Sequence, residues 1–509
     1  MKSLHIALAA LASFLFSLAA IARPTDPPRP NVLLIVADDQ GTADFSHLGI
    51  MDDVRTPRLD ALAASGTRFT QAYATSPICN PSRVGLITGR YQQRWNNFYY
   101  GGGRGLPDEA VTLAERLRDA GYATGYFGKV HTGGPDRTPD APGFPLNHGF
   151  DRFFGTTTGG RTHYLYHSNK AVQRYGEAAG QMFVAPMWDD DEPIEWEGFT
   201  TVAFTDEAIE FIEGTGDRPF FVQLAYNAVH NFAWQLPQDE LEARGLEPFP
   251  DWDPDEIGYR EWYKGVHRRD WPEGRAYYLA QLEILDREIG RLLDVLETRG
   301  ELDNTLVIYT VDNGGCVPDW ADNTPLAGSK YHLLEGGIRV PLIFAMPEVL
   351  PVGIAVDSPV SALDIVPTVL ELCDVSHQGT HGKQFDGWTI IGPTEPPPPN
   401  LMEELGLEPF TTPFQQSLGH NFNPPLFWDI GWQWAVRHGD WKLMVTTNEN
   451  VAKNQADFEQ VKVRMGVHLY NLADDPGETT NLAERHPEEV AELRALHRAW
   501  RAEVGQPIE

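Results

Sequence analysis

Residues 76–90, SPICNPSRVGLITGR, place a thiol, a proline and a cation close together. Cys79, Pro81, Ser82 and Arg83 form the pattern C-x-P-S-R. Taken alone, this pattern predicts a thiol in a turn closed by Pro81, followed by a helix that Ser82 caps. A helix N-terminus and a neighbouring Arg83 both favour the thiolate, so the pKa of Cys79 is expected to be lowered. The other interpretation is a buried structural cysteine beside an ordinary turn.

Polar side chains follow two apolar runs that are typical of buried strands. These runs are residues 31–37 (NVLLIVA) and 304–311 (NTLVIYTV). In open α/β sheets, ligands bind where such strands end, and carboxylate and amide oxygens suit Ca²⁺ or Mg²⁺ better than zinc. If the two strands are neighbours, the sequence predicts a metal site there; otherwise these residues belong to two separate solvated loops. The candidate ligands are Asp38, Asp39, Asp312 and Asn313.

Basic side chains supply further candidates for chemistry. Lys129 and His131 stand two residues apart in G-K-V-H, which is a more specific signal than a lone histidine. His230 follows the apolar run at residues 219–226, and Lys330 ends the sequence G-S-K. Taken singly, a histidine is more often a structural residue whose hydrogen bonds are satisfied. Weaker candidates for contact with a substrate are His163, His167 and His332.

The elements that must position these groups alternate between apolar strands and amphipathic helices. A fourth such strand is expected at residues 340–346, and this alternation predicts an α/β fold with a large, mostly parallel sheet sandwiched by helices. Residues 132–196 show little periodicity and are expected to form long loops around a pocket, and residues 231–275 form an insertion. The predicted helices cover residues 56–66, 107–121, 203–213, 275–299 and 361–373.

The pattern changes beyond about residue 376. Residues 434–445 predict a hairpin with a tight Gly-Asp turn, residues 468–472 a short strand, and residues 484–503 a closing helix. These elements predict a smaller C-terminal α+β domain that carries an antiparallel sheet. The expected divisions are a leader at residues 1–22, a catalytic α/β domain at 23–376 and the smaller domain at 377–509.

The N-terminus has the composition of a secretory signal peptide. Lys2 precedes an apolar run over residues 8–18, and Ala20, Ile21 and Ala22 form a triplet suited to cleavage. The chain is therefore expected to be exported, to the periplasm or the medium. A membrane anchor is the competing interpretation, but this run is short for a bilayer, and no later apolar run is long enough to span one.

The net charge limits the possible partners, and the cysteine count limits the possible disulfides. The chain of 509 residues carries a formal net charge of −32, which argues against nucleic acid as a partner. Repulsion of an anionic substrate is screened beyond about 8 Å, so a local cluster of Lys, Arg and metal can override it. If Cys79 is consumed chemically, Cys316 and Cys373 can form one disulfide at most, and we expect two buried free thiols.

Together these motifs resemble those of the type I sulfatases, which are formylglycine-dependent members of the alkaline phosphatase superfamily. The C-x-P-S-R stretch is similar to the family signature, and D-D, G-K-x-H, D-N-G and G-x-K occur in the family's order. Residues 469–482 are similar to its C-terminal run L-Y-(D/N)-L…D-P-x-E…N-L. The resemblance covers nearly the whole mature chain, and it implies an alkaline phosphatase-like sulfatase fold.

The resemblance also implies a role for each candidate residue. Cys79 would be oxidised to formylglycine, whose hydrate is the nucleophile, beside a calcium ion that is implied in preference to Mg²⁺. His230 would protonate the leaving alkoxide, and His131 would deprotonate the second hydroxyl of the hydrate to expel sulfate. The implied catalytic residues are Cys79, Arg83, Lys129, His131, His230 and Lys330, and the implied metal ligands are Asp38, Asp39, Cys79, Asp312 and Asn313.

The function implied is sulfate-ester hydrolysis by an exported sulfatase that acts on a sulfated saccharide. Its partners would be the sulfated carbohydrate and a formylglycine-generating maturation enzyme. One alternative is a phosphonate monoester or phosphodiester hydrolase of the same superfamily, and comparison of turnover would separate the two. Another is a sulfated-glycan binding protein in which Cys79 is never converted, which mass spectrometry of the peptide spanning Cys79 would identify.

Overall fold

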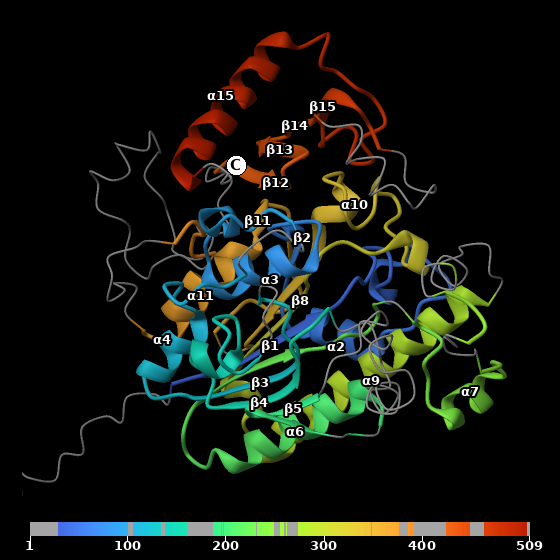
Figure 1. Ribbon diagram of the computed structural model, residues 1–509, viewed down its shortest axis with the longest axis vertical. Helices are drawn as coiled ribbons and strands as arrows, with labels where there is room; N and C mark the ends of the chain where they lie inside the picture. The colour runs from blue at the N-terminus through green and yellow to red at the C-terminus, as the bar shows by residue number, and fades with distance from the viewer. Residues whose placement is uncertain are drawn as a thin grey trace, which may run out of the picture.

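Two β-sheets form the framework of the protein, and in the computed structural model the smaller sheet lies at one end of the larger (Figure 1). The weaker candidates His163 and His167 lie outside the described residues, as do residues 1–28. The structure describes residues 29–99, 105–133, 138–159, 187–194, 196, 198–230, 232–248, 255–258, 261, 273–347, 349–375, 385–390, 424–447 and 463–505.

Within the described part of the chain, the larger sheet has 11 strands and is mixed, with parallel strands at its centre. Its strands are β1 (Asn31–Ala37), β2 (Thr67–Tyr73), β3 (Ala123–Lys129), β4 (Arg152–Thr156), β5 (Met187–Asp189), β6 (Glu192–Ile194), β7 (Phe220–Ala225), β8 (Thr305–Val311), β9 (Arg339–Ala345), β10 (Ile354–Val356) and β11 (Val360–Ser361). They lie in the order β10-β2-β9-β8-β1-β7-β3-β4-β5-β6, and β11 pairs with β2. Strands β8, β1, β7, β3 and β4 run parallel, whereas β9, β5 and β6 pair antiparallel with their neighbours. The predicted mostly parallel sheet is confirmed.

Helices cover both faces of the larger sheet because successive side chains of a strand point to opposite faces. The helices formed by described residues are α2 (Pro57–Ser65), α3 (Cys79–Thr88), α4 (Leu113–Asp119), α6 (Thr200–Gly214), α7 (Gln238–Arg244), α9 (Gly274–Arg299), α10 (Glu335–Ile338), α11 (Ile365–Leu372) and α15 (Pro487–Val504). Leu33 and Ile35 of β1 belong to the core shared with α2, α6 and α9. Val32 and Leu34 belong to the opposite core, shared with α3, α4 and α11.

Several element boundaries differ from the sequence prediction. Helix α4 begins at Leu113 rather than at residue 107, because the side chains and backbone N–H groups of Thr112 and Glu115 bond reciprocally in a capping box. The helix expected at 361–373 begins instead as β11 and a 3₁₀ turn, and α11 starts at its fifth residue. Strand β2 was not predicted, and the prediction of loops over residues 132–196 is wrong where β4, β5 and β6 form.

The smaller sheet is antiparallel, in the order β12 (Leu426–Asp429), β13 (Gln433–His438), β14 (Trp441–Thr446) and β15 (Gly466–Asn471). His438 pairs with Trp441, so Gly439 and Asp440 form the predicted tight turn. Helix α15 packs on one face, and the other face packs against the larger sheet and the loop before α10 (Figure 1). The antiparallel sheet with a closing helix is confirmed, whereas the domain boundary after residue 376 stays a prediction.

Candidate active site

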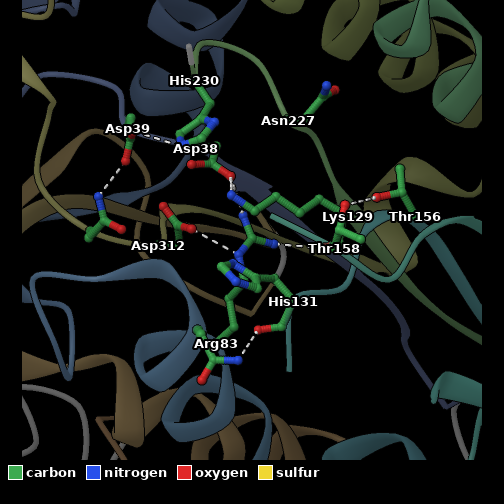
Figure 2. Close-up of polar contacts among 12 residues, drawn as sticks. Asp38, Asp39, Arg83, Lys129, His131, Thr156, Thr158, Asn227, His230 and Asp312 are labelled. Carbon is green, nitrogen blue, oxygen red and sulfur yellow. Dashed lines mark hydrogen bonds and ion pairs between the residues drawn. The ribbon is translucent and has the colours of Figure 1, made fainter. Parts of the chain in front are cut away.

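The carboxyl ends of β1 and β8 meet at one edge of the larger sheet. The two strands pair in parallel along their whole length, and the backbone N–H of Asp312 donates to the Ala37 carbonyl at 3.1 Å. Asp38 and Asp39 therefore lie beside Asp312 and Asn313. The predicted convergence of the two polar pairs is confirmed, and Figure 2 shows the three aspartates grouped around one centre.

Helix α3 carries Cys79 as its first residue. The prediction that Ser82 caps the helix is wrong, because the N-cap is Ile78 and Ser82 lies inside the helix with 1% of its surface exposed. Pro81 is tolerated because a helix's first turn has no intrahelical acceptor for its missing N–H. Every residue of α3 is buried, so Cys79 is held in a packed helix rather than in an exposed turn.

Arg83 lies one turn after Cys79 and ties α3 to three strand ends. Its Nε donates to Asp312 Oδ2 at 2.8 Å, its Nη2 to Asp38 Oδ2 at 3.0 Å, and its Nη1 to the Lys129 carbonyl at 2.9 Å. The Lys129 ammonium pairs with the same oxygen of Asp38 (Figure 2). The guanidinium is 1% exposed, so its charge is balanced by these carboxylates rather than by water.

The glycine of G-K-x-H places Lys129 at the edge of the sheet. Gly128 has a φ of 119°, and a Cβ at this position would lie 1.9 Å from the Ala225 carbonyl of β7. Only glycine permits this approach and this backbone conformation. The Tyr126 hydroxyl also donates to the Lys129 carbonyl at 2.6 Å, which further fixes the strand end.

Asp39 is the centre of a second set of contacts. Lys330 Nζ donates to Asp39 Oδ2 at 2.7 Å, and Asn313 Nδ2 donates to Asp39 Oδ1 at 2.6 Å. His230 Nε2 lies 3.4 Å from Asp39 Oδ2. Lys330 and His230, which were predicted from separate motifs, are therefore brought to the same carboxylate.

The donor set fits a hard divalent cation. Among the four predicted ligands, Asp38, Asp312 and Asn313 each have one buried oxygen with no hydrogen-bond partner among the described residues. Asp38, Asp39, Cys79 and His230 each offer a ligand atom, and these atoms lie within 4.8 Å of one another. Buried polar atoms are seldom left unbonded, and carboxylate and amide oxygens suit Ca²⁺ and Mg²⁺. This cluster could hold such an ion.

The ionisable groups of the cluster are shifted by burial and by one another. Burial raises the pKa of Asp39 to about 7 against the opposing effect of Lys330, and burial with Asp312 raises the pKa of Asp38. Burial opposes the charge of Lys330, but Asp39 holds its pKa well above the usual value. Burial also raises the pKa of Cys79, so the predicted low-pKa thiol is wrong.

Asn80, which the sequence analysis missed, joins the nucleophile helix to the His131 segment. Its Nδ2 donates to the His131 carbonyl at 2.9 Å and to the Gly133 carbonyl at 3.1 Å, and its Oδ1 accepts from Asn97 at 3.0 Å. His131 has a φ of 47°, a conformation that these bonds help to hold. The signal for Asn80 was its place as the variable residue of C-x-P-S-R.

A second buried group lies beside Asp39. Cys316, Asp319 and Asp39 have ligand atoms within 4.8 Å of one another, and the sequence had indicated only a buried thiol here. Burial, with Asp319 in addition, raises the pKa of Cys316 well above its usual value. Cys316 and Cys373 are both buried and unpaired, which confirms the prediction of two free thiols.

His332, a weaker candidate, is a structural residue. It is 2% exposed, its ring lies edge to face with Trp432 at 6.3 Å, and its Nδ1 lies 3.2 Å from the Lys330 carbonyl. Burial lowers its pKa to about 4. As the pH falls below the usual pKa of histidine, the imidazole of His332 is protonated in the unfolded chain but stays neutral in the folded protein. The free energy of unfolding therefore decreases as the pH falls.

His332→Gln is therefore expected to make the protein less sensitive to acid. Wild-type protein should lose about 3 kcal/mol more unfolding free energy than the variant between pH 7.5 and pH 4. Urea unfolding of both proteins across this range measures the difference. Equal acid dependence of the two proteins would show that His332 titrates normally.

Comparison with known proteins gives a consistent family result. The family model described as Sulfatase matches residues 30–375. The chain is 27% identical to an uncharacterized sulfatase of Schizosaccharomyces pombe, with 96% of each chain covered. It is 28% identical to arylsulfatase J of Mus musculus (91% of this chain and 74% of the relative) and 29% identical to N-acetylgalactosamine-6-sulfatase of Canis lupus familiaris (71% and 65%).

Solved structures agree with these sequence matches. The crystal structure of Ps i-CgsB in complex with k-i-k-neocarrahexaose matches with a TM-score of 0.71 and 26% identity, and 94% of each chain is covered. A structure of BT4656 in complex with D-glucosamine-2-N,6-O-disulfate matches with a TM-score of 0.64 over 94% of this chain and 98% of that one. At 20% identity, the second match supports the fold alone.

Proposed function

Because the chain belongs to the sulfatase family and is a sulfuric ester hydrolase, we propose that it desulfates a sulfated saccharide after export, using formylglycine formed from Cys79 and a bound Ca²⁺. One observation carries the proposal: the buried oxygens of Asp38, Asp312 and Asn313 that lack a hydrogen-bond partner among the described residues lie beside Cys79 and three cationic side chains. Three carboxylates balance those three cations, so a divalent ion leaves the cluster positive. That excess charge suits an anionic ester despite the acidic chain.

The cation would be held by the three aspartates and Asn313, together with the oxidised side chain at position 79. When bound, it supplies positive charge beside the nucleophile and the sulfate oxygens. Calcium is proposed rather than Mg²⁺ because a cluster of carboxylate and amide ligands suits its larger coordination number, whereas Mg²⁺ usually keeps several waters.

Conversion of Cys79 is supported by the environment of the thiol. Burial raises its pKa, and the carboxylates of Asp38 and Asp312 add to this effect, so little thiolate is available at neutral pH. A hydrated aldehyde at this position offers two hydroxyl groups on one carbon. One can act as the nucleophile, while the other can lose a proton when sulfate leaves.

Two lysines would bind the sulfate group. Lys129 and Lys330 pair with Asp38 and Asp39, and both ammonium groups lie at the sheet edge beside Cys79. Fixed cations in a buried site stabilise charge that develops on the sulfate oxygens without costly rearrangement. Arg83 acts indirectly, because its three hydrogen bonds hold Asp38, Asp312 and the end of β3 in place.

The two histidines are assigned opposite proton transfers. His230 lies in the cluster of ligand atoms with Asp39 and Cys79, and in its protonated form it would give a proton to the leaving oxygen. His131 follows Lys129 and is held to α3 through Asn80, so it would take the proton from the second hydroxyl. The Asn80 bonds make the position of His131 depend on the helix that carries the nucleophile.

The saccharide substrate class is supported by relatives. Ps i-CgsB was solved with an oligosaccharide, and the canine relative is named for a sulfated amino sugar. A screen of defined sulfated mono- and oligosaccharides for released sulfate tests the proposal. Turnover of phosphodiesters or phosphonates above that of every sulfate ester would favour the alternative hydrolase.

Removal of the cation is expected to destabilise and inactivate the protein. Calcium at a hundred times its Kd should add about 3 kcal/mol to the free energy of unfolding, and the buried carboxylates lose that compensation in EGTA. Thermal unfolding and direct calcium binding, measured with EGTA and after readdition of Ca²⁺ or Mg²⁺, test this effect. Asp312→Asn should weaken calcium binding and the exposed Asp303→Asn should not; an unchanged Tm and full activity in EGTA would contradict the calcium site.

Export and domain division complete the proposal. No helix among the described residues is both long enough and apolar enough to cross a membrane. We propose cleavage after residue 22, which N-terminal sequencing of the mature protein tests. The division into units of residues 23–376 and 377–509 stays a prediction, and limited proteolysis tests it.

A further inference from the structure

Tyr331 directly follows Lys330 in the loop before α10. Its φ is 74°, in the left-handed region, and its backbone N–H donates to the Pro77 carbonyl at 2.8 Å. Pro77 lies two residues before Cys79, so this bond joins the Lys330 loop to the segment that enters the nucleophile helix. Tyr331 therefore stands where the two halves of the sulfate site meet.

A bulky aromatic residue is unusual in this backbone conformation. Glycine and asparagine adopt a positive φ readily, whereas a tyrosine with a φ of 74° is strained by its Cβ. Such strain is kept where the surrounding structure holds it, and it is concentrated at functional sites. The backbone alone would favour a different residue at position 331, so the reason for tyrosine must lie in its side chain.

The side chain of Tyr331 lies against the sulfate-binding lysine. The centre of its ring is 5.5 Å from Lys330 Nζ, and that ammonium also donates to Asp39 at 2.7 Å. The ring packs on the buried cluster that contains Tyr73, Ile78 and the inner face of the smaller sheet, and Tyr331 as a whole is half-buried. A half-buried aromatic ring supported by this cluster thus lies beside the ammonium proposed to bind sulfate.

We propose that Tyr331 contacts the substrate and that its ring forms the wall against which the sugar ring carrying the sulfate packs. The inference rests on the proposed function and specifies its substrate as a sulfated pyranoside. A pyranose presents faces of C–H groups that pack on an aromatic ring, and a sulfate held at Lys330 brings the attached sugar within reach of this wall. The phenol hydroxyl is not required for this contact.

The test compares wild-type protein with Tyr331→Gly and Tyr331→Phe. Tyr331→Gly should raise the KM for a sulfated pyranoside by about tenfold, because the ring contact is lost. It should leave the inhibition constant of inorganic sulfate within about twofold, because sulfate binds to the cations alone. Tyr331→Phe keeps the ring and should change neither constant by more than about threefold.

Protein stability separates a substrate contact from a structural role. Because glycine relieves the strained φ, Tyr331→Gly should unfold at a Tm near that of the wild type. Asp374→Gly is a matched control, since Asp374 is exposed, has a φ of 50° and lies beyond α11; it should leave KM unchanged. If Tyr331→Gly weakens sulfate and sugar binding equally and clearly lowers the Tm, the proposal is overturned. An unchanged KM of Tyr331→Gly for the sulfated pyranoside would overturn it as well.

The same measurements keep this inference distinct from the proposed function. Wild-type protein that cleaves an aryl sulfate but no sulfated saccharide would overturn the saccharide assignment, and the sugar wall with it. Wild-type turnover of a sulfated pyranoside that is insensitive to Tyr331→Gly would overturn the wall alone. If Tyr331→Phe is as impaired as Tyr331→Gly, the hydroxyl rather than the ring makes the contact, and the stacking proposal is wrong.

Discussion

Replacing Cys79 by alanine is expected to abolish sulfate-ester turnover while leaving the fold intact. Cys79 is 4% exposed at the start of α3, and alanine differs from it by one buried atom, so the unfolding free energy should change by about 1 kcal/mol or less. The chemistry should disappear because alanine can be neither oxidised nor hydrated. Released sulfate and thermal unfolding, measured on the same preparation, check both parts of this expectation.

Cys373→Ala is the matched control for this experiment. Cys373 is also a buried, unpaired thiol, but it lies just after α11 and away from the charged cluster, so turnover should be unchanged. Mass spectrometry of the wild-type peptide should show a loss of about 18 Da at Cys79 relative to an unmodified cysteine. Turnover by Cys79→Ala near the wild-type rate would refute the nucleophile assignment, and an unmodified thiol in inactive wild-type protein would favour the binding-protein alternative.

The core of the candidate site could be predicted because strand direction dictates it. Residues 31–37 and 304–311 are apolar enough to be central strands, and parallel central strands end at the same edge. The placement of Asp38 beside Asp312 follows from that rule. Which side chain bonds to which does not follow, because the contacts of Arg83 with both aspartates depend on how α3 packs.

The failed predictions concern local features that tertiary structure overrides. A helix N-terminus and Arg83 indicated a low-pKa thiol, but burial and two carboxylates outweigh them and raise the pKa of Cys79. Ser82 was predicted to cap the helix because serine is a preferred N-cap residue, but the helix starts three residues earlier, at Cys79. Strands β4 and β5 were missed because their pairing, rather than their composition, makes them strands.

Lys442→Met is expected to destabilise the protein by about 3 to 5 kcal/mol, the usual cost of leaving buried charges without a partner. Lys442 Nζ donates to Glu335 Oε1 at 2.8 Å and lies 3.0 Å from Glu478 Oε1, and all three side chains are fully buried. The Glu335 carboxylate also accepts from the Tyr73 hydroxyl at 2.7 Å, and Glu478 accepts from the Glu335 backbone N–H at 2.7 Å. The network thus joins the smaller sheet to β2 and α10.

The loss should depend on pH in a defined direction. Burial, with Glu335 in addition, raises the pKa of Glu478 to about 7 even with Lys442 present. Between about pH 4.5 and 7, Glu478 is therefore protonated in the folded protein but ionised in the unfolded chain. The free-energy cost of ionising Glu478 in the folded protein is fully present only above that range. Urea unfolding should show a larger loss for Lys442→Met at pH 8 than at pH 5, and an equal loss would mean that both carboxylates stay charged.

Adding Glu478→Gln to Lys442→Met tests whether unpaired charge is the cause. The second change removes one buried carboxylate, so the double variant should recover part of the stability at pH 8, whereas a loss due to packing alone would not be recovered. Arg299→Met, which breaks the partly exposed pair of Arg299 with Glu301, should cost less than about 1 kcal/mol.

Because Glu335 begins α10, whose Gly337 carbonyl accepts from the Gly314 N–H at 3.0 Å, calcium binding by Lys442→Met should weaken together with its stability. A destabilised variant with unchanged calcium affinity would place the network outside the support of the active site.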